Sequence, residues 1–159
     1  MLAENTVLTG RRAITRSYAK INLTLDVLSK RENGYHDIKM IMQTVSLFDL
    51  ILVDKTHKGI SISTNLPYLP CNEKNIAYKA ADAFFKATGI RGGAKIVIHK
   101  NIPVAAGLAG GSGNCAAVLT AINMLHGNPL SNDELMHIGA SLGADVPYCF
   151  DGGTQLAEG

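Results

Sequence analysis

A glycine-rich stretch in the second half of the chain is the segment whose residue types point most directly to chemistry. It covers residues 103–117, PVAAGLAGGSGNCAA, and carries four glycines within residues 107–113. Glycine costs about 0.5–1 kcal/mol relative to alanine inside a helix or strand, so a need other than local stability explains this density. A glycine-rich loop that leads into a helix presents unpaired backbone N–H groups beside the positive end of the helix dipole. The stretch therefore predicts a site for an anion, above all a phosphate.

Other interpretations of the same stretch fit its residues less well. A tight connection between a strand and a closely packed helix needs only one or two glycines. The Walker phosphate loop requires a lysine after its last glycine, and the sequence has no lysine after Lys100, so that loop is excluded. A dinucleotide-binding loop is matched loosely by residues 111–116, GSGNCA, but it should directly follow a buried strand. The tight connection and the dinucleotide loop stay open as weaker alternatives.

The elements that must position this stretch begin with strands. Residues 21–27 alternate apolar and polar side chains, which is the period of a half-buried strand carrying Lys20 and Asn22 together on its polar face. A polar loop at residues 30–37 contains the turn signal Asn33-Gly34. Residues 40–45, 48–54 and 59–64 then predict further strands, so that the first half resembles an antiparallel meander.

Helical periodicity dominates the second half. It predicts a helix that begins after Asn75 and ends at Gly89, a helix capped by Ser112 that continues to about His126, and a helix after Ser131. Strands are predicted at residues 94–100 and 144–150, and residues 152–159 suggest the start of another. These elements predict an α+β fold, a two-layer sandwich of a mostly antiparallel sheet and packed helices.

Composition narrows the class of protein. With 159 residues, 47% of them hydrophobic and 18% charged, the chain suits one soluble domain, and its first residues lack the features of a secretory signal. Cys71, Cys115 and Cys149 are odd in number and widely spaced, which indicates reduced thiols and a cytoplasmic protein. A net charge of +2 without a basic block argues against nucleic acid as a partner, and the five histidines have no metal-binding spacing.

Four segments together resemble the GHMP kinases, the superfamily of galactokinase, homoserine kinase and mevalonate kinase. The segments are AKINLTLDV, KRENGYHDIKMIMQTVSLFD, NIPVAAGLAGGS and GADVPYCFDGGTQLAEG. Along almost the whole chain they are similar to one branch of that family, the 4-diphosphocytidyl-2-C-methyl-D-erythritol kinases of non-mevalonate isoprenoid biosynthesis. The resemblance implies a ribosomal protein S5 domain 2-like fold. It also implies ATP as phosphoryl donor, Mg²⁺ as cofactor, and the 2-hydroxyl group of the cytidine diphosphate-linked methylerythritol as acceptor.

The resemblance also implies which residues bind ATP. They are Pro103, Val104, Ala105, Ala106, Gly107, Leu108, Ala109, Gly110, Gly111, Ser112 and Gly113. The hydroxyl group of Ser112 is the candidate for a phosphate contact or a Mg²⁺ ligand, although a helix cap has the same appearance in sequence. Ala109 stands where the branch often has glycine.

Catalytic and substrate-binding residues follow from the same resemblance. Asp145 is similar to the catalytic aspartate of the family and Lys20 to its catalytic lysine. A carboxylate is a weak base for an alcohol, so it needs a neighbouring cation that orients the hydroxyl group and stabilises negative charge. Asn22 is expected to hold the substrate or the lysine. Tyr35 and His36 are expected to stack on the cytosine ring and to bond its polar edge.

The extent of the resemblance leads to expectations about domains. Residues 16–159 correspond to the amino-terminal, ATP-binding domain of the family, and residues 1–15 are expected to be an extension or a tag remnant. Family members carry a second, carboxy-terminal domain that helps close the cleft, and we expect this chain to lack it. The first hypothesis is a kinase fragment of reduced activity. The alternative is a nucleotide-binding or scaffolding module without turnover, in which exposed apolar surface favours a homodimer.

Overall fold

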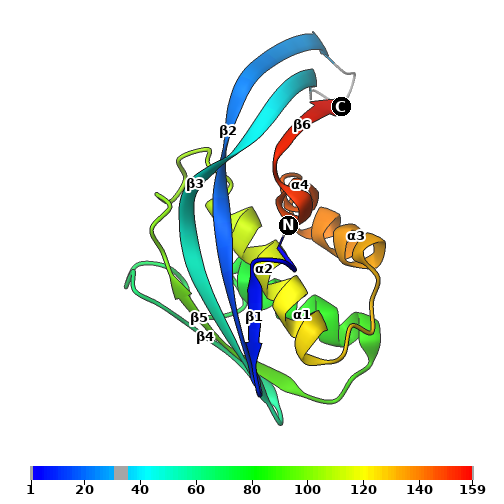
Figure 1. Cartoon of the computed structure of the whole chain (residues 1–159). Coiled ribbons are helices and arrows are strands. Elements are labelled where there is room, and N and C mark those ends of the chain that lie inside the picture. Colours follow the sequence, from blue (N-terminus) through cyan, green and yellow to red (C-terminus); the bar gives the residue numbers. More distant parts are fainter. Residues whose placement is uncertain (1, 31–35, 159) are drawn as a thin grey trace.

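The structure, a computed structural model, describes residues 2–30 and 36–158 and packs helices on one face of a sheet (Figure 1). The strand order is β1-β2-β3-β5-β4, and β6 pairs with a second stretch of β3. The strands are β1 (Thr6–Thr9), β2 (Arg12–Lys30), β3 (His36–Thr56), β4 (Gly59–Thr64), β5 (Gly93–His99) and β6 (Thr154–Glu158), and the helices are α1 (Ile76–Thr88), α2 (Gly110–Leu125), α3 (Asn132–Leu142) and α4 (Val146–Asp151). The predicted α+β sandwich is confirmed.

The antiparallel pair β2 and β3 is the spine of the sheet, and it extends well beyond the helices (Figure 1). The far edge of β3 serves two partners, because residues 50–56 pair with β5 and residues 39–43 pair with β6. Two predictions about this region were wrong. Residues 40–45 and 48–54 belong to one continuous strand, and β4 pairs in parallel with β5, so the first half is not a simple meander.

The alternation of apolar and polar residues in β2 does not predict which face of the strand is buried. Ile21, Leu23, Leu25 and Val27 were expected to face the core, yet they are between 38% and 61% exposed, whereas Lys20 is only 5% exposed. Two physical features explain the difference. The hairpin projects past the helices that would cover it, and three register shifts in the pairing of β2 with β3 turn the strand about its axis.

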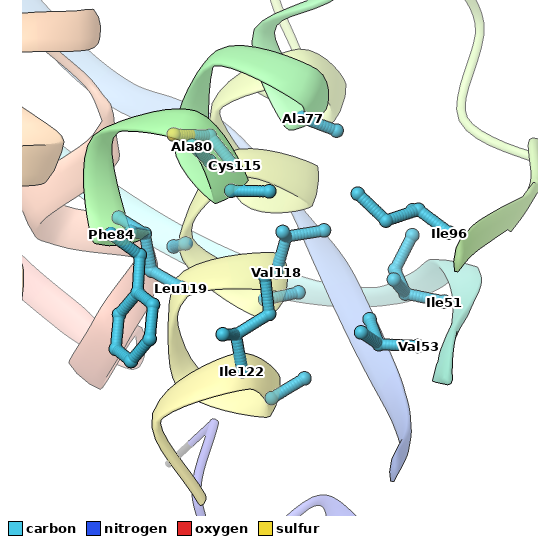
Figure 2. Packing of buried hydrophobic residues seen from close by; sticks show 14 of the residues in the cluster. Ile51, Val53, Ala77, Ala80, Phe84, Ile96, Cys115, Val118, Leu119 and Ile122 are labelled. Atoms are coloured by element: carbon cyan, nitrogen blue, oxygen red, sulfur yellow. The ribbon is translucent and has the colours of Figure 1, made fainter. Parts of the chain in front are cut away.

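The core lies between the lower half of the sheet and α2. Figure 2 shows Val118 and Ile122 of α2 directed toward Ile51, Val53 and Ile96 of the sheet. The helix α1 packs against the other side of α2, so α2 is buried along most of its length. This sandwiched helix carries the glycine-rich stretch at its amino end.

Helix boundaries follow capping chemistry closely. Asn75 caps α1 through its side chain, Gly89 ends it with a φ of 66°, and Ser131 and Glu134 form a capping box at the start of α3. The start of α2 differs from expectation. The helix begins at Gly110 with Ala109 as its N-cap, so Ser112 lies inside the first turn and is not the cap.

The predicted strand at residues 144–150 is wrong, because residues 146–151 form the short helix α4. Pro147 fits the first turn of a helix, where its missing N–H group leaves no bond unmade. Val146 and Phe150 are four residues apart, and both are buried, as one face of a helix requires. The strand expected after it is confirmed as β6.

The amino-terminal residues contribute to the fold. Thr6–Thr9 form β1, and Leu2 is buried in the core with its N–H group bonded to the carbonyl oxygen of Phe150. The prediction that residues 1–15 are an extension or tag remnant concerns their origin and stays a prediction.

Gly113 allows α2 to approach β2. A Cβ atom at this position would lie 2.4 Å from Oγ of Ser17, far inside van der Waals contact, whereas a Cβ atom at Gly111 would meet only Cγ2 of Ile76, at 3.7 Å. We therefore predict that Gly113→Ala destabilises the chain by about 1–3 kcal/mol through overpacking. The matched substitution Gly111→Ala should leave stability unchanged or raise it slightly. Urea denaturation followed by circular dichroism measures both, and equal midpoints would contradict the close contact.

Candidate active site

An open cleft of about 490 Å³ lies over the glycine-rich stretch. Residues 103–112 line one side of it, and the start of α1, with Asn75 and Ile76, lines another. Lys100 and Asp145 also reach its surface. Of the residues predicted to bind ATP, only Gly113 is absent from this lining, because it is buried where α2 meets β2. The cleft is large enough for a small-molecule ligand.

The backbone of the loop at residues 103–109 is shaped for an anion. Ala105, Gly107 and Ala109 have left-handed φ angles of 57°, 73° and 55°. Turns of this kind direct backbone N–H groups into concave nests that bind anions. Ala109, the N-cap residue of α2, makes no side-chain hydrogen bond to the first turn of the helix. The N–H groups of that turn are therefore not occupied by a capping side chain. The left-handed conformation also explains why glycine suits this position.

Lys20, Asn22 and Asp145 come together beside this loop, as the resemblance implied. Nζ of Lys20 lies 3.7 Å from Oδ2 of Asp145 and donates a hydrogen bond to Oδ1 of Asn22, 2.9 Å away. The backbone N–H of Lys20 donates to the carbonyl oxygen of Leu108, at 3.1 Å, which fastens the loop to β2. The Lys20 side chain is almost buried, whereas that of Asp145 is 34% exposed, so the carboxylate stays accessible from the cleft.

A bulge in the sheet aims Lys20 at this site. Tyr18 pairs with Phe48 and Lys20 pairs with Thr44, so three residues of β3 lie opposite Ala19 alone. Tyr18 and Phe48 are in edge-to-face contact, whereas Lys20 reaches Asp145 at the start of α4. Bulges redirect side chains in this way and are common next to active sites.

A second set of contacts holds Asp145 opposite Lys20. Oη of Tyr148, in α4, is 2.9 Å from Oγ1 of Thr44 and donates to the carbonyl oxygen of Gly153 at 2.8 Å. Thr44 is the residue that pairs with Lys20 across the sheet, so this contact sets the distance between α4 and Lys20. The carboxylate of Asp145, the N-cap residue of α4, makes no capping bond and stays available for other partners.

Three residues that sequence analysis missed lie beneath the loop, namely Asp49, Lys100 and Asn114. All three are less than 10% exposed, and Asp49 and Lys100 form an ion pair. One signal for them was present. Asp49 is the single charged residue between Lys39 and Asp54 in a strand that is otherwise largely apolar, and a buried charge of that kind needs a partner.

The remaining predicted residues are placed only in part. Tyr35 lies outside the described residues, and of His36 only the backbone, at the start of β3, is described. Ser112 lines the cleft from the first turn of α2. Within residues 2–30 and 36–158, no three side chains of His, Cys, Asp or Glu gather as a metal site would require. In the same ranges, no helix is long and apolar enough to cross a membrane.

Comparisons of sequence and of fold relate the chain to known proteins. The family profile described as GHMP kinases N terminal domain matches residues 75–153. The 4-diphosphocytidyl-2-C-methyl-D-erythritol kinase of Clostridium botulinum (strain Alaska E43 / Type E3) is 52% identical over 144 residues, which are 91% of this chain and 51% of that protein. The chain belongs to the GHMP kinase family. The 4-diphosphocytidyl-2-C-methyl-D-erythritol kinase of Caldicellulosiruptor saccharolyticus is also 52% identical, over 92% of this chain and 51% of that protein.

Solved structures of two kinases share the fold. A crystal structure of 4-(cytidine 5'-diphospho)-2C-methyl-D-erythritol kinase superposes with a TM-score of 0.81 at 36% identity, over 92% of this chain and 52% of that one. Homoserine kinase from Cytophaga hutchinsonii has a TM-score of 0.65 at 21% identity, over 94% and 49%, which supports the fold alone. The chain spans about half the length of the curated relatives it matches.

The cysteines around the site are predicted to be chemically inert. Sγ of Cys149 donates to the carbonyl oxygen of Asp145 at 3.2 Å, and burial raises the pKa of both Cys149 and Cys115 to about 12. Cys115 and Cys149 therefore have a negligible thiolate fraction near neutral pH. Cys71, in contrast, is exposed and accessible to reagents. At about pH 8, we expect 5,5′-dithiobis(2-nitrobenzoate) to titrate one thiol in the folded GHMP kinase chain and three in denaturant. Cys71→Ser should remove the fast thiol, and fast reaction of a second thiol would contradict this burial.

Proposed function

We propose that this chain forms the ATP-binding half of a small-molecule kinase that transfers the terminal phosphoryl group of ATP to an alcohol. The observation that carries the proposal is the pair formed by Lys20 and Asp145, 3.7 Å apart, beside a loop shaped for phosphate. Phosphoryl transfer needs the phosphates held, charge neutralised and the acceptor hydroxyl group placed in line. The described residues offer a candidate group for each of these tasks.

The phosphates are held by the loop and the first turn of α2. The left-handed turns at Ala105, Gly107 and Ala109 direct N–H groups inward, and the positive end of the α2 dipole adds to their attraction. The ammonium group of Lys20 is bonded to Asn22, which limits its movement and keeps its charge beside Asp145. Lys20 thereby stabilises negative charge that develops on the acceptor oxygen.

Asp145 is the proposed base. Its carboxylate is partly exposed toward the cleft and accepts the proton of the hydroxyl group as that oxygen attacks phosphorus. The hydroxyl group of Ser112 is the proposed protein ligand for Mg²⁺, since Ser112 lines the cleft from the first turn of α2. Magnesium in kinase sites typically takes few protein ligands in addition to substrate phosphates, and when bound it neutralises phosphate charge.

The proposed acceptor is the 2-hydroxyl group of 4-diphosphocytidyl-2-C-methyl-D-erythritol. Two relatives are named as kinases of this compound. Each is 52% identical to the chain over more than nine tenths of the chain's length, which supports the assignment. Tyr35 and His36 are the proposed contacts of the cytosine ring, by stacking and by hydrogen bonding of its edge. Cytoplasmic location and a homodimer belong to the same proposal.

A second candidate function is nucleotide binding without turnover, as a scaffolding fragment. The observation that favours it is the uncovered apolar side of the β2-β3 hairpin, where Leu23 and Val27 are 55% and 61% exposed. An active site that cannot exclude water transfers phosphoryl groups slowly. Such surface also favours association with another chain.

Asp145→Asn tests the proposed function. We expect this variant to lose about 10²–10⁴-fold in the rate of ADP release with Mg-ATP and the cytidine substrate, because the amide cannot accept the proton. Its affinity for ATP, measured by calorimetry, should change little. The matched control is Asp151→Asn, which removes an exposed carboxylate at the other end of α4.

The two candidate functions differ in the result for the unmodified chain. Turnover that the Asp145→Asn variant loses and the Asp151→Asn variant keeps would support the kinase. Binding of ATP without turnover would support the scaffolding fragment. If neither ATP nor the cytidine substrate binds, both candidates are wrong for this chain.

A further inference from the structure

A buried carboxylate beneath the loop takes no part in the reaction described above. Asp49 lies on β3 and is wholly inaccessible to solvent. Both of its oxygens are nevertheless occupied by donors from other parts of the chain. We name Asp49, Lys100, Asn101, Ile102 and Asn114 the Asp49 cluster.

The first contacts of the cluster tie down the entry to the loop. Oδ1 of Asp49 accepts the backbone N–H groups of Asn101 and Ile102, at 2.7 Å and 2.9 Å. These two residues directly precede Pro103, where the loop begins. The side chain of Ile102 is 1% exposed, so packing reinforces the hydrogen bonds. The entry is therefore fixed in both direction and position.

The other contacts tie down the exit of the loop. Oδ2 of Asp49 forms the ion pair with Lys100. Nζ of Lys100 lies close to Gly110, the first residue of α2, because a Cβ atom added at that glycine would be only 2.9 Å from it. With its amide turned so that the nitrogen faces Asp49, Asn114 donates to Oδ2 of Asp49 at 2.9 Å and to the carbonyl oxygen of Gly110 at 3.1 Å. One carboxylate therefore holds both ends of the loop.

The energetics favour a role in positioning over one in stability alone. A buried ion pair is weak evidence for stability, because its desolvation cost offsets most of its attraction. The loop, in contrast, needs fixed ends. It contains two alanines, Ala105 and Ala109, in the left-handed conformation, which residues other than glycine rarely adopt because their Cβ atom crowds the backbone. A loop with free ends would relax from that conformation.

We propose that Asp49 is a positioning residue for phosphate binding. It acts through Asn101, Ile102 and Asn114 and does not touch the ligand. By fixing residues 101–102 and the first turn of α2, it keeps the N–H groups of the loop oriented before a phosphate arrives. Its charge also neutralises Lys100 in the absence of ligand. This inference rests on the proposed function, because it names a residue on which ATP binding depends.

Asp49→Asn tests the proposal. The amide keeps the shape of the side chain, but it is neutral, and its nitrogen must face either Lys100 or the two backbone donors. We expect affinity for ATP and for ADP to fall about 10–100-fold, as for the loss of charge-assisted hydrogen bonds. Affinity for adenosine, which has no phosphate, should not change. The matched control is Asp54→Asn on the same strand, which removes an exposed ion pair with Arg12 and should leave all three affinities unchanged.

The ratio of adenosine affinity to ATP affinity separates positioning from loss of structure. A merely destabilised chain would bind all three ligands more weakly in the same proportion. Equal losses for adenosine and ATP, or no loss for either, would overturn the proposal. If Asp49→Asn does not fold, Asn114→Ala releases only the exit of the loop, and we expect a loss of about 3–10-fold for ATP and none for adenosine. Wild-type affinity for ATP in that variant would overturn the proposal as well.

Hydrogen exchange in the absence of ligand distinguishes this proposal from the proposed function. In Asp49→Asn, the amides of Asn101 and Ile102 should exchange at least about tenfold faster, while those of α1 stay protected. If the unmodified chain binds no ATP, the proposed function fails, and the exchange rates still decide whether Asp49 orders the loop. Unchanged exchange at both amides would overturn the positioning role on its own.

Discussion

The close contact between α2 and β2 at Gly113 is the constraint on which the site depends. The groups proposed to react and to bind phosphate lie on different elements, with Lys20 on β2 and the N–H groups of the first turn at the start of α2. They share one site only if the helix lies almost against the strand, and the absence of a side chain at Gly113 allows that approach to Ser17. The hydrogen bond between Lys20 and Leu108 then joins the two elements at the loop itself. Core packing around Val118 and Ile122 keeps the helix in place, so the hydrophobic core and the site are parts of one arrangement.

Two lysines near the loop are each paired with a carboxylate, and the difference between the pairs supports the different roles proposed for them. Asp49 is fully buried, and its oxygens accept from two backbone N–H groups, from Lys100 and from Asn114, so they have little capacity for a ligand. Asp145 is one third exposed, makes no capping bond and lies 3.7 Å from its lysine. The first pair is therefore suited to hold structure, and the second is suited to react. Residue type alone does not distinguish the two pairs, because the difference lies in how many donors surround each carboxylate.

The sequence predicted the features that depend on local chemistry. The start of α1 at Asn75, the start of α3 at Ser131 and the glycine-rich loop lie where local patterns placed them, whereas the predicted cap Ser112 lies inside the first turn of α2. Features set by tertiary packing were harder to predict. Residues 144–150 were predicted as a strand, but burial of one helical face and Pro147 in the first turn favour a helix at residues 146–151.

Failure of the alternation rule in β2 has the same origin. A period of two shows that a strand has two different faces, but it does not show which face the helices cover, nor where a bulge exchanges them. Lys20 was grouped correctly with Asn22 and was nevertheless expected on the exposed side. Asp49 and Lys100 were missed for a related reason. They are 51 residues apart in sequence, and only the pairing of β3 with β5 brings them together.

The two sides of the site differ in how complete they are within the described residues. The phosphate side has a loop fixed at both ends, the first turn of α2, and a buried lysine whose charge is already balanced. On the acceptor side, Asn22 and the strand beyond it are exposed, and no described helix covers them. Nucleotide binding needs only the first side, because preorganised N–H groups do not depend on enclosure. Transfer needs both, since a hydroxyl group must be held in line and water excluded. Affinity for ATP is therefore the part of the proposed function that the described residues support most directly, whereas the proposed transfer also needs the hairpin to be enclosed.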